Sequence, residues 1–162
     1  MSPADSHTTD PETLVSALDS ELRTLIQVLD MLEIEHEALM GSDPERLEQA
    51  VVAKQNAIAG HLKSRSHRES LGLRESLREQ LETHPTLVNG LREKALDLVA
   101  ELSDLALKSK NMNARNGKLI SGLKERTNTS LKVLRPEAAS ITLYGDSGSA
   151  ENTMGSRLLG SA

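Results

Sequence analysis

The sequence predicts an all-α protein, an elongated antiparallel helical hairpin or three-helix, coiled-coil-like bundle with a long last helix and a flexible C-terminal tail. Three observations support this fold class. Apolar residues recur every three or four positions through most of the chain. The helix-start signal Asp-Pro-Glu occurs twice, at residues 10–12 and 43–45. Aromatic residues make up only 1% of the sequence, which favours a core of interdigitating aliphatic side chains on helices.

The first expected helix spans residues 11–40. Asp10 is its expected N-cap, Pro11 occupies the first helical position, and Glu12 places a negative charge near the positive end of the helix dipole. Gly41 is expected to end the helix, because glycine adopts the left-handed conformation without strain. The apolar seam consists of Val15, Leu18, Leu22, Leu25, Leu29, Leu32, His36 and Leu39.

The second expected helix spans residues 44–82 and is bent or broken. It begins so soon after the first helix that it must turn back antiparallel to it. Gly72 lies in a stretch where the apolar pattern weakens, and a glycine inside a helix costs about 1 kcal/mol relative to alanine. The residues expected to face the core are Leu47, Val51, Ile58 and Leu62, and then Leu73, Leu77 and Leu81.

The third expected helix spans residues 86–134 and begins just after Pro85, which biases His84 away from helical geometry. At 1.5 Å per residue this helix would be about 70 Å long, more than a compact domain of this size can cover. Part of its seam is therefore expected to remain free for another protein. The seam consists of Val88, Leu91, Ala95, Leu98, Leu102, Leu105, Ser109, Met112, Asn116, Leu119 and Leu123.

The two ends of the chain differ from this helical domain, which is expected to span residues 10–135. Residues 1–9 are polar and are expected to be a flexible N-terminus. Residues 136–162 are rich in Ser, Gly, Ala and Thr, and such a segment buries too little apolar surface to offset its ordering entropy. We therefore expect a disordered tail, interrupted by two short apolar stretches at residues 141–144 and 157–159.

Composition narrows the function classes. The 162 residues carry a net charge of −5, which argues against a general nucleic-acid binder, since such a protein needs a basic excess to neutralise phosphates. There are no cysteines, which excludes disulfides and thiolate metal sites. No apolar run approaches the length of a membrane-spanning helix, and residues 1–10 lack the pattern of a signal peptide. A cytoplasmic protein without membrane insertion is expected.

Three motifs resemble catalytic, metal or phosphate sites, and each has a simpler explanation. Glu33 and His36 have the Glu-x-x-His spacing of di-iron bundles, but no second such pair follows, so His36 is better explained as a polar break in the seam. Residues 145–148 resemble the nucleophile loop of a serine protease, but lie in a tail without the required scaffold. Residues 63–78 are rich in arginine with interleaved glutamates, which is typical of a solvated helix face. No catalytic residue, metal site or cofactor is predicted, and the protein is not expected to be an enzyme.

Two features remain as candidates for binding another protein. The first is the apolar far end of the last helix, which can bind a partner helix or complete the chain's own core or a dimer interface. The second is Tyr144, the single aromatic residue, which lies in the tail and is of a type that anchors docking motifs. The candidate residues for binding a protein client are Leu119, Ile120, Leu123, Leu131 and Leu134.

The sequence resembles the flagellar export chaperones of the FlgN family. The resemblance rests on the leucine heptads of the first helix, on Lys54 followed by Ile58 and Leu62, on Arg68 before Leu71, on the run Asn-Ala-Arg-Asn-Gly-Lys-Leu-Ile at residues 113–120, and on Thr-Leu-Tyr-Gly at residues 142–145. It spans nearly the whole chain, although the tail after Gly148 is longer than in the shortest members, so that no role follows for Leu158 and Leu159.

This resemblance implies a non-enzymatic cytosolic chaperone that binds the hook-filament junction proteins FlgK and FlgL, prevents their premature association and delivers them to the export gate protein FlhA. The family's client-binding segment corresponds to the apolar residues between Leu119 and Leu134, and its gate-docking tyrosine to Tyr144. Two alternatives stay open on the residues alone: a structural coiled-coil subunit that self-associates, and a ferritin-like metal enzyme at His36. The chain is expected to be a monomer or a homodimer.

Overall fold

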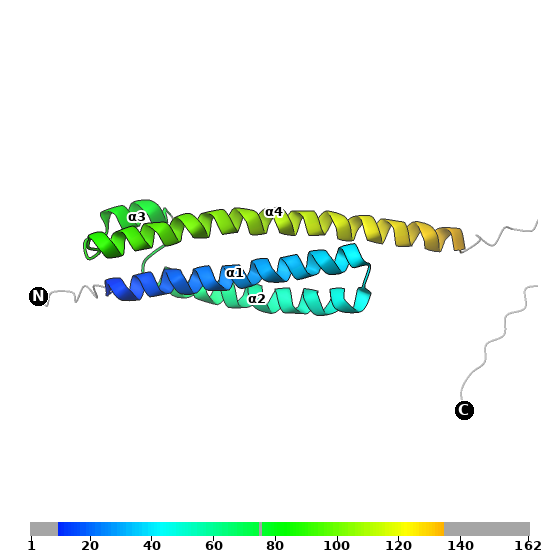
Figure 1. Cartoon of the computed structure of the whole chain (residues 1–162), viewed down its shortest axis with the longest axis horizontal. Helices are drawn as coiled ribbons and strands as arrows, with labels where there is room; N and C mark the ends of the chain where they lie inside the picture. The colour runs from blue at the N-terminus through cyan, green and yellow to red at the C-terminus, as the bar shows by residue number, and fades with distance from the viewer. Residues whose placement is uncertain (1–9, 75, 135–162) are drawn as a thin grey trace, which may run out of the picture.

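The computed structural model of the chain describes residues 10–74 and 76–134 and is built from helices in this part of the chain (Figure 1). In chain order these are α1 (Pro11–Gly41), α2 (Pro44–Ser70), α3 (Leu77–Thr83) and α4 (Asn89–Leu134). α1 packs against both α2 and α4, while the short α3 packs on the start of α4. α4 runs in the same direction as α1, and α2 runs antiparallel to both. The predicted all-α, elongated fold class is confirmed.

The helix starts form as the sequence predicts. The carboxylate of Asp10 accepts a hydrogen bond from the backbone N–H of Thr13 at 3.2 Å, and the carboxylate of Asp43 accepts one from the N–H of Arg46 at 3.0 Å. Each bond satisfies a donor that has no partner within the helix. The predicted end of α1 is displaced by one residue. Gly41 is still helical, and Ser42 adopts the left-handed conformation (φ 52°), because the next N–H, of Asp43, reaches back to the carbonyl of Ala38.

Residues 44–82, which were expected to form one bent or broken helix, form two separate helices. α2 ends at Ser70 and α3 begins at Leu77. Gly72 lies in the connection with φ +93°, a conformation that favours glycine. α4 begins at Asn89 rather than at residue 86. Val88, predicted as the first seam residue, precedes the helix and is 67% exposed, because its neighbour Leu87 is the side chain that enters the core.

The main hydrophobic core lies at the end of the bundle where α1 begins. The first half of α1 and the first half of α4 face each other there, and the connection after α2, the helix α3 and the loop before α4 cover them. The buried members are Leu14, Val15, Leu18, Leu22, Leu25, Leu73, Leu81, Leu87, Ala95, Leu98, Val99 and Leu102. All these side chains except Ala95 are Leu or Val, which agrees with the prediction of an aliphatic core.

α1 is buried on two faces, whereas the sequence analysis identified one. The predicted seam, from Val15 to Leu39, is buried apart from the partly exposed His36, and packs toward α4. A second row with the same spacing is also covered, and it faces α2. This second row consists of Leu14, Ala17, Glu21, Thr24, Val28, Met31, Glu35 and Ala38. α1 is buried on two faces because it lies between α2 and α4.

The prediction for α2 is wrong in part. Ile58 and Leu62 were expected to face the core, but Leu62 is 53% exposed and Ile58 is also exposed. The side of α2 that α1 covers carries small and polar residues at heptad spacing instead. They are Ala50, Lys54, Ala57, His61, Ser64 and Arg68, and the predicted Leu47 is the one large apolar residue of this row, at the start of the helix. Small side chains allow the two helices to lie close together, and the polar ones pair across the interface, as described below.

Candidate functional site

The far end of α4 extends beyond the rest of the bundle. α4 has 46 residues and α1 has 31, which correspond to lengths of about 69 Å and about 46 Å. Figure 1 shows α4 continuing past the turn that joins α1 to α2. Every residue from 124 to 134 is exposed. We call residues 124–134 the overhang.

The structure divides the five predicted client-binding residues into two groups. Leu119 and Leu123 are partly buried near the end of α1, and Ile120 beside them is exposed. Leu131 and Leu134 lie on the overhang and are 56% and 77% exposed. Val133, which the sequence analysis did not single out, is exposed to the same degree as Leu134. The part of the chain that the structure describes therefore leaves the outer part of this apolar segment largely exposed.

An apolar groove lies where the overhang begins. Its volume is about 290 Å³. It is lined by the last turn of α1, the connecting turn, the first turn of α2 and one side of α4, through Ala38, Leu39, Ser42, Asp43, Pro44, Leu47, Leu123 and Thr127. We call it the tip groove. Its walls come from segments about 80 residues apart in the chain, so sequence patterns do not reveal it, and Leu123 is the one lining residue among the predicted client-binding residues.

A buried polar cluster fixes α4 to the hairpin one to two turns before the tip groove. Glu35 on α1 is fully buried, and its carboxylate accepts a hydrogen bond from Lys54 Nζ on α2 at 2.6 Å. The other carboxylate oxygen accepts a hydrogen bond from Asn116 Nδ2 on α4 at 3.0 Å. All three helices therefore meet at Glu35. A buried carboxylate is tolerable here because both oxygens have donors and one donor is charged.

Asn116 has partners for both ends of its amide. Its nitrogen donates to the carbonyl of Leu32 at 2.9 Å as well as to Glu35, so its oxygen is the acceptor for His36 Nδ1 at 3.0 Å. His36 Nδ1 must then carry the hydrogen. Glu33 points elsewhere, toward Lys108 Nζ at 3.5 Å. The predicted role of His36 as a polar position in the seam agrees with these contacts.

A second buried ion pair lies at the opposite end of the α1–α2 interface. Arg68 on α2 pairs with Glu21 on α1, and its guanidinium also donates to the carbonyls of Leu73 and Arg74, the latter at 3.3 Å. The arginine thus connects the end of α2 to the chain that leads into α3. Lys54, Arg68 and Asn116, three residues on which the family resemblance rests, are the residues that hold the helices in register.

Comparison with known protein families agrees with this geometry. The sequence profile of the FlgN protein family matches residues 10–152, which is most of the chain and all of the described part. The chain belongs to the FlgN family. No curated protein and no solved structure shows a significant match. FlgN proteins are flagellar export chaperones that serve type III protein export during flagellum assembly.

The remaining predictions for this FlgN-family chain concern membrane-spanning helices, metal sites and residues of the tail. No helix in residues 10–74 and 76–134 is both long enough and apolar enough to cross a membrane. No group of three or more His, Asp or Glu side chains within these residues is arranged to hold a metal ion. Tyr144, residues 145–148, Leu158 and Leu159 lie outside the described residues.

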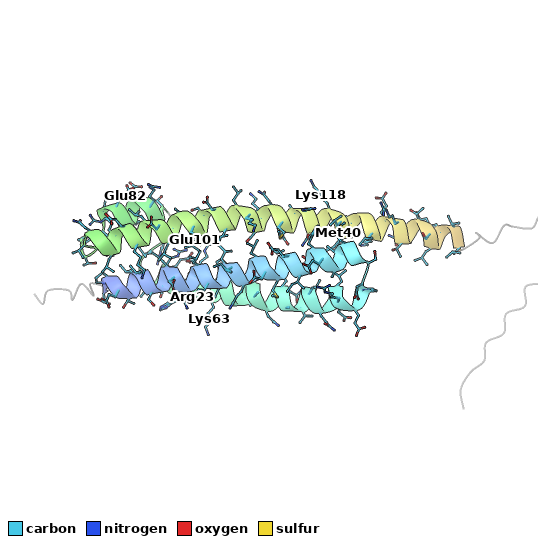
Figure 2. The ribbon with its side chains drawn as sticks, viewed as in Figure 1. Arg23, Met40, Lys63, Glu82, Glu101 and Lys118 are labelled. Atoms are coloured by element: carbon cyan, nitrogen blue, oxygen red, sulfur yellow. The ribbon has the colours of Figure 1, made fainter. Side chains whose placement is uncertain are left out.

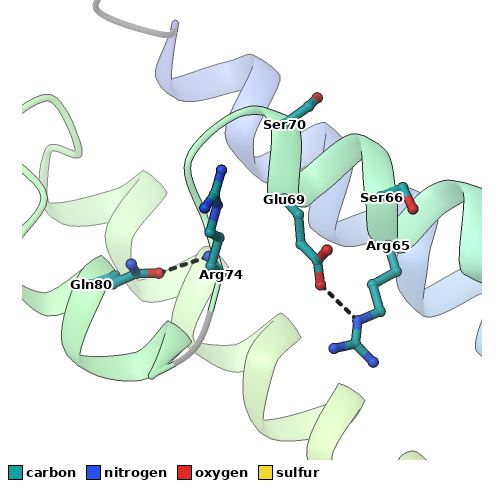
Figure 3. A pocket seen from close by; sticks show the side chains of 6 residues that line it. All are labelled: Arg65, Ser66, Glu69, Ser70, Arg74 and Gln80. Carbon is teal, nitrogen blue, oxygen red and sulfur yellow. Dashed lines mark hydrogen bonds and ion pairs between the residues drawn. The ribbon is translucent and has the colours of Figure 1, made fainter.

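The arginine-rich segment lines an open polar pocket of about 770 Å³ between the end of α2 and the start of α3 (Figure 3). Arg65 pairs with Glu69 at 2.8 Å, and the backbone N–H of Arg74 donates to Gln80 Oε1 at 3.0 Å. The hydrogen bond from Arg65 lowers the pKa of Glu69, and the charges of Arg65, Arg68 and Arg74 act in the same direction. The Arg65–Glu69 pair is an i,i+4 contact of a solvated helix face, whereas Arg68 of the same segment is buried against Glu21, which the sequence did not predict.

Proposed function

We propose that this FlgN-family chain is a cytoplasmic, non-enzymatic chaperone that binds the hook-filament junction proteins FlgK and FlgL and delivers them to the export gate. The observation that carries the proposal is the overhang of α4, whose apolar residues Leu131 and Leu134 are left largely exposed by residues 10–74 and 76–134. A single helix with an exposed apolar stripe is completed by a second helix. A junction protein with an apolar terminal helix is suited to fill this position.

The proposed client site combines the overhang with the tip groove. Leu119, Ile120 and Leu123 form its inner part, next to the groove, and Leu131 and Leu134 form its outer part. A helix laid along these residues would bury apolar surface at about 25 cal/mol per Å². While it is held there, the client's own apolar stripe is unavailable for premature association with other junction proteins.

The first test is a titration of the full-length chain with purified FlgK and FlgL. The double variant Leu131→Ser, Leu134→Ser is expected to weaken binding by about tenfold or more, because two exposed anchors are lost, while the helix content measured by circular dichroism stays the same. Leu107→Ser is the matched control, since Leu107 is an exposed leucine on the same helix before the overhang. Equal affinity of the double variant and the control would contradict the assignment.

The proposal for gate docking concerns Tyr144 and rests on the family resemblance alone. Tyr144→Ala is expected to weaken binding to the cytoplasmic domain of FlhA while the affinity for FlgK and FlgL is unchanged, because the tyrosine lies ten residues beyond the end of α4. Co-sedimentation measures both interactions. Equal binding of FlhA by the variant and the unmodified chain would remove this role.

A structural subunit that self-associates is the second candidate, and the exposure of Leu131, Val133 and Leu134 also favours it. Two copies can pair through their overhangs. Light scattering separates the two functions. A tight dimer that excludes FlgK and FlgL at every concentration would favour self-association, and a monomer or a dimer that still binds client would favour the chaperone.

A further inference from the structure

Charge is distributed unevenly between the two long helices. α1 carries seven acidic side chains and one basic side chain, a net charge of −6. Residues 105–134 of α4 carry seven basic side chains and one acidic side chain, a net charge of +6, although the whole chain carries −5. α1 lies along the first part of this basic segment and ends before the overhang (Figure 1).

α1 therefore serves as an internal example of a helix that this part of α4 binds. Its apolar seam packs toward α4 through Leu32 and Leu39, which are both buried. At the edge of the contact, Glu33 Oε1 lies 3.5 Å from Lys108 Nζ. The chain thus already shows the combination that suits this surface: an apolar stripe flanked by carboxylates.

Arg126 repeats the position of Lys108 beyond the end of α1. The two residues are 18 positions apart, which is about five full helical turns, so they lie on the same edge of α4. A helix that continued the line of α1 past Gly41 would face Arg126 as Glu33 faces Lys108. Within residues 10–74 and 76–134, Arg126 forms no ion pair. The apolar centre of the surface also continues from Leu123 at the tip groove to Leu134, which lies 11 positions, or about three full helical turns, further along the same side of α4.

We propose that the partner of the overhang is an acidic amphipathic helix that continues the line of α1, with its apolar stripe on Leu123 and Leu134 and a carboxylate at Arg126. The identification of this helix as part of an export client rests on the proposed function. The acidic and amphipathic character of the helix does not rest on that function, because it is inferred from the charge of α4 and from the packing of α1 on α4.

The geometry favours a helix over an anionic membrane surface. The tip groove is a hollow of about 290 Å³ lined by three helices, and a helix can enter such a hollow whereas a flat bilayer would pass over it. The basic residues are also not gathered on one face of α4. Figure 2 shows Lys118 on the side of α4 that points away from α1, whereas Lys108 reaches toward it. A helix that lies in a membrane interface also uses large apolar anchors such as Trp and Phe, and residues 105–134 contain neither.

The test uses the full-length chain and two synthetic helical peptides with the same leucine spacing, one with glutamates and one with lysines beside the leucines. The acidic peptide is expected to bind at least tenfold more tightly than the basic one. Arg126→Glu should reduce its affinity by about three- to tenfold and reduce the dependence of the affinity on salt between 0.1 and 0.5 M NaCl. Lys118→Glu, with the same charge change on the side of α4 that points away from α1, should leave both quantities unchanged.

Each other outcome overturns the proposal. Equal affinity for the two peptides, or an equal effect of Arg126→Glu and Lys118→Glu, would show that the basic edge of α4 does not select acidic partners. Binding to vesicles with 30% phosphatidylglycerol that Arg126→Glu abolishes would assign the surface to lipid. A dimer that Arg126→Glu dissociates would assign it to a second copy. None of these results depends on FlgK or FlgL, so a failure of the proposed function is recognised separately by the titration with those proteins.

Discussion

The two buried faces of α1 are built from different chemistry. The face toward α4 is a row of leucines, of which Leu18 is fully buried. The face toward α2 contains small residues and two buried carboxylates, Glu21 and Glu35, each paired with a basic side chain of α2. A leucine row can slide by a heptad with little loss, whereas each carboxylate has a partner in only one register. The comparison suggests that the first face supplies stability and the second supplies alignment.

The largest expected effect is on the polar face. Arg68→Met should lower the free energy of unfolding by about 3 to 5 kcal/mol, because it leaves Glu21 buried without its cation and removes the donors to Leu73 and Arg74. Urea denaturation measures this loss. Arg23→Met, which removes an exposed pair with Asp19, is the control and should change stability by less than about 0.5 kcal/mol. A loss below 1 kcal/mol for Arg68→Met would mean that the polar face does not constrain the fold.

The leucine face should show the next largest effect. Leu18→Ala should cost about 3 kcal/mol, because the side chain is fully buried in the main core and its removal leaves a cavity. The same urea titration applies. Ile26→Ala, on the exposed side of α1, is the control and should cost much less. Equal losses at the two positions would contradict the placement of the core.

The third prediction concerns Asn116, which contacts α1 where its leucine face and its polar face meet. Asn116→Ala should cost about 2 kcal/mol, because Glu35, His36 and the carbonyl of Leu32 each lose a partner in a buried site. Asn113→Ala, exposed on the same helix, is the matched control. Hydrogen exchange should show that the amides of α4 after residue 116 become less protected in the Asn116 variant only. Unchanged protection would mean that the cluster does not hold α4.

The smallest expected effect lies outside both faces, at Glu69. Its folded-state pKa is lowered by the hydrogen bond from Arg65, so its stabilising contribution is present at pH 7 and is lost as the pH falls through that lowered pKa. Glu69→Gln should therefore reduce the melting temperature slightly at pH 7 and not at pH 3. Glu48→Gln, which changes another exposed carboxylate of α2, should have no effect at either pH. A difference at Glu69 that persists at pH 3 would contradict the electrostatic cause.

The sequence was sufficient to predict the all-α fold, both aspartate N-caps, the leucine seam of α1 and the excess length of α4, but not the separate helix α3. These features depend on residues close together in the chain, through helical periodicity and the local chemistry of helix ends. The excess length follows from a residue count. The apolar candidates for client binding could also be identified from the sequence, because the leucine pattern of the last helix continues past the length that the other helices can cover.

Only the tertiary structure decided which helix lies in the middle and what covers its second face. Periodicity gives the face on which a residue lies but not the segment that packs against it, so Glu21, Lys54 and Arg68 resemble solvent-exposed charges in the sequence. Their burial depends on partners 19 to 47 positions away. The tip groove and the alignment of Arg126 with Lys108 arise in the same way, because each requires the end of α1 to be placed along α4 by contacts that only the folded chain makes.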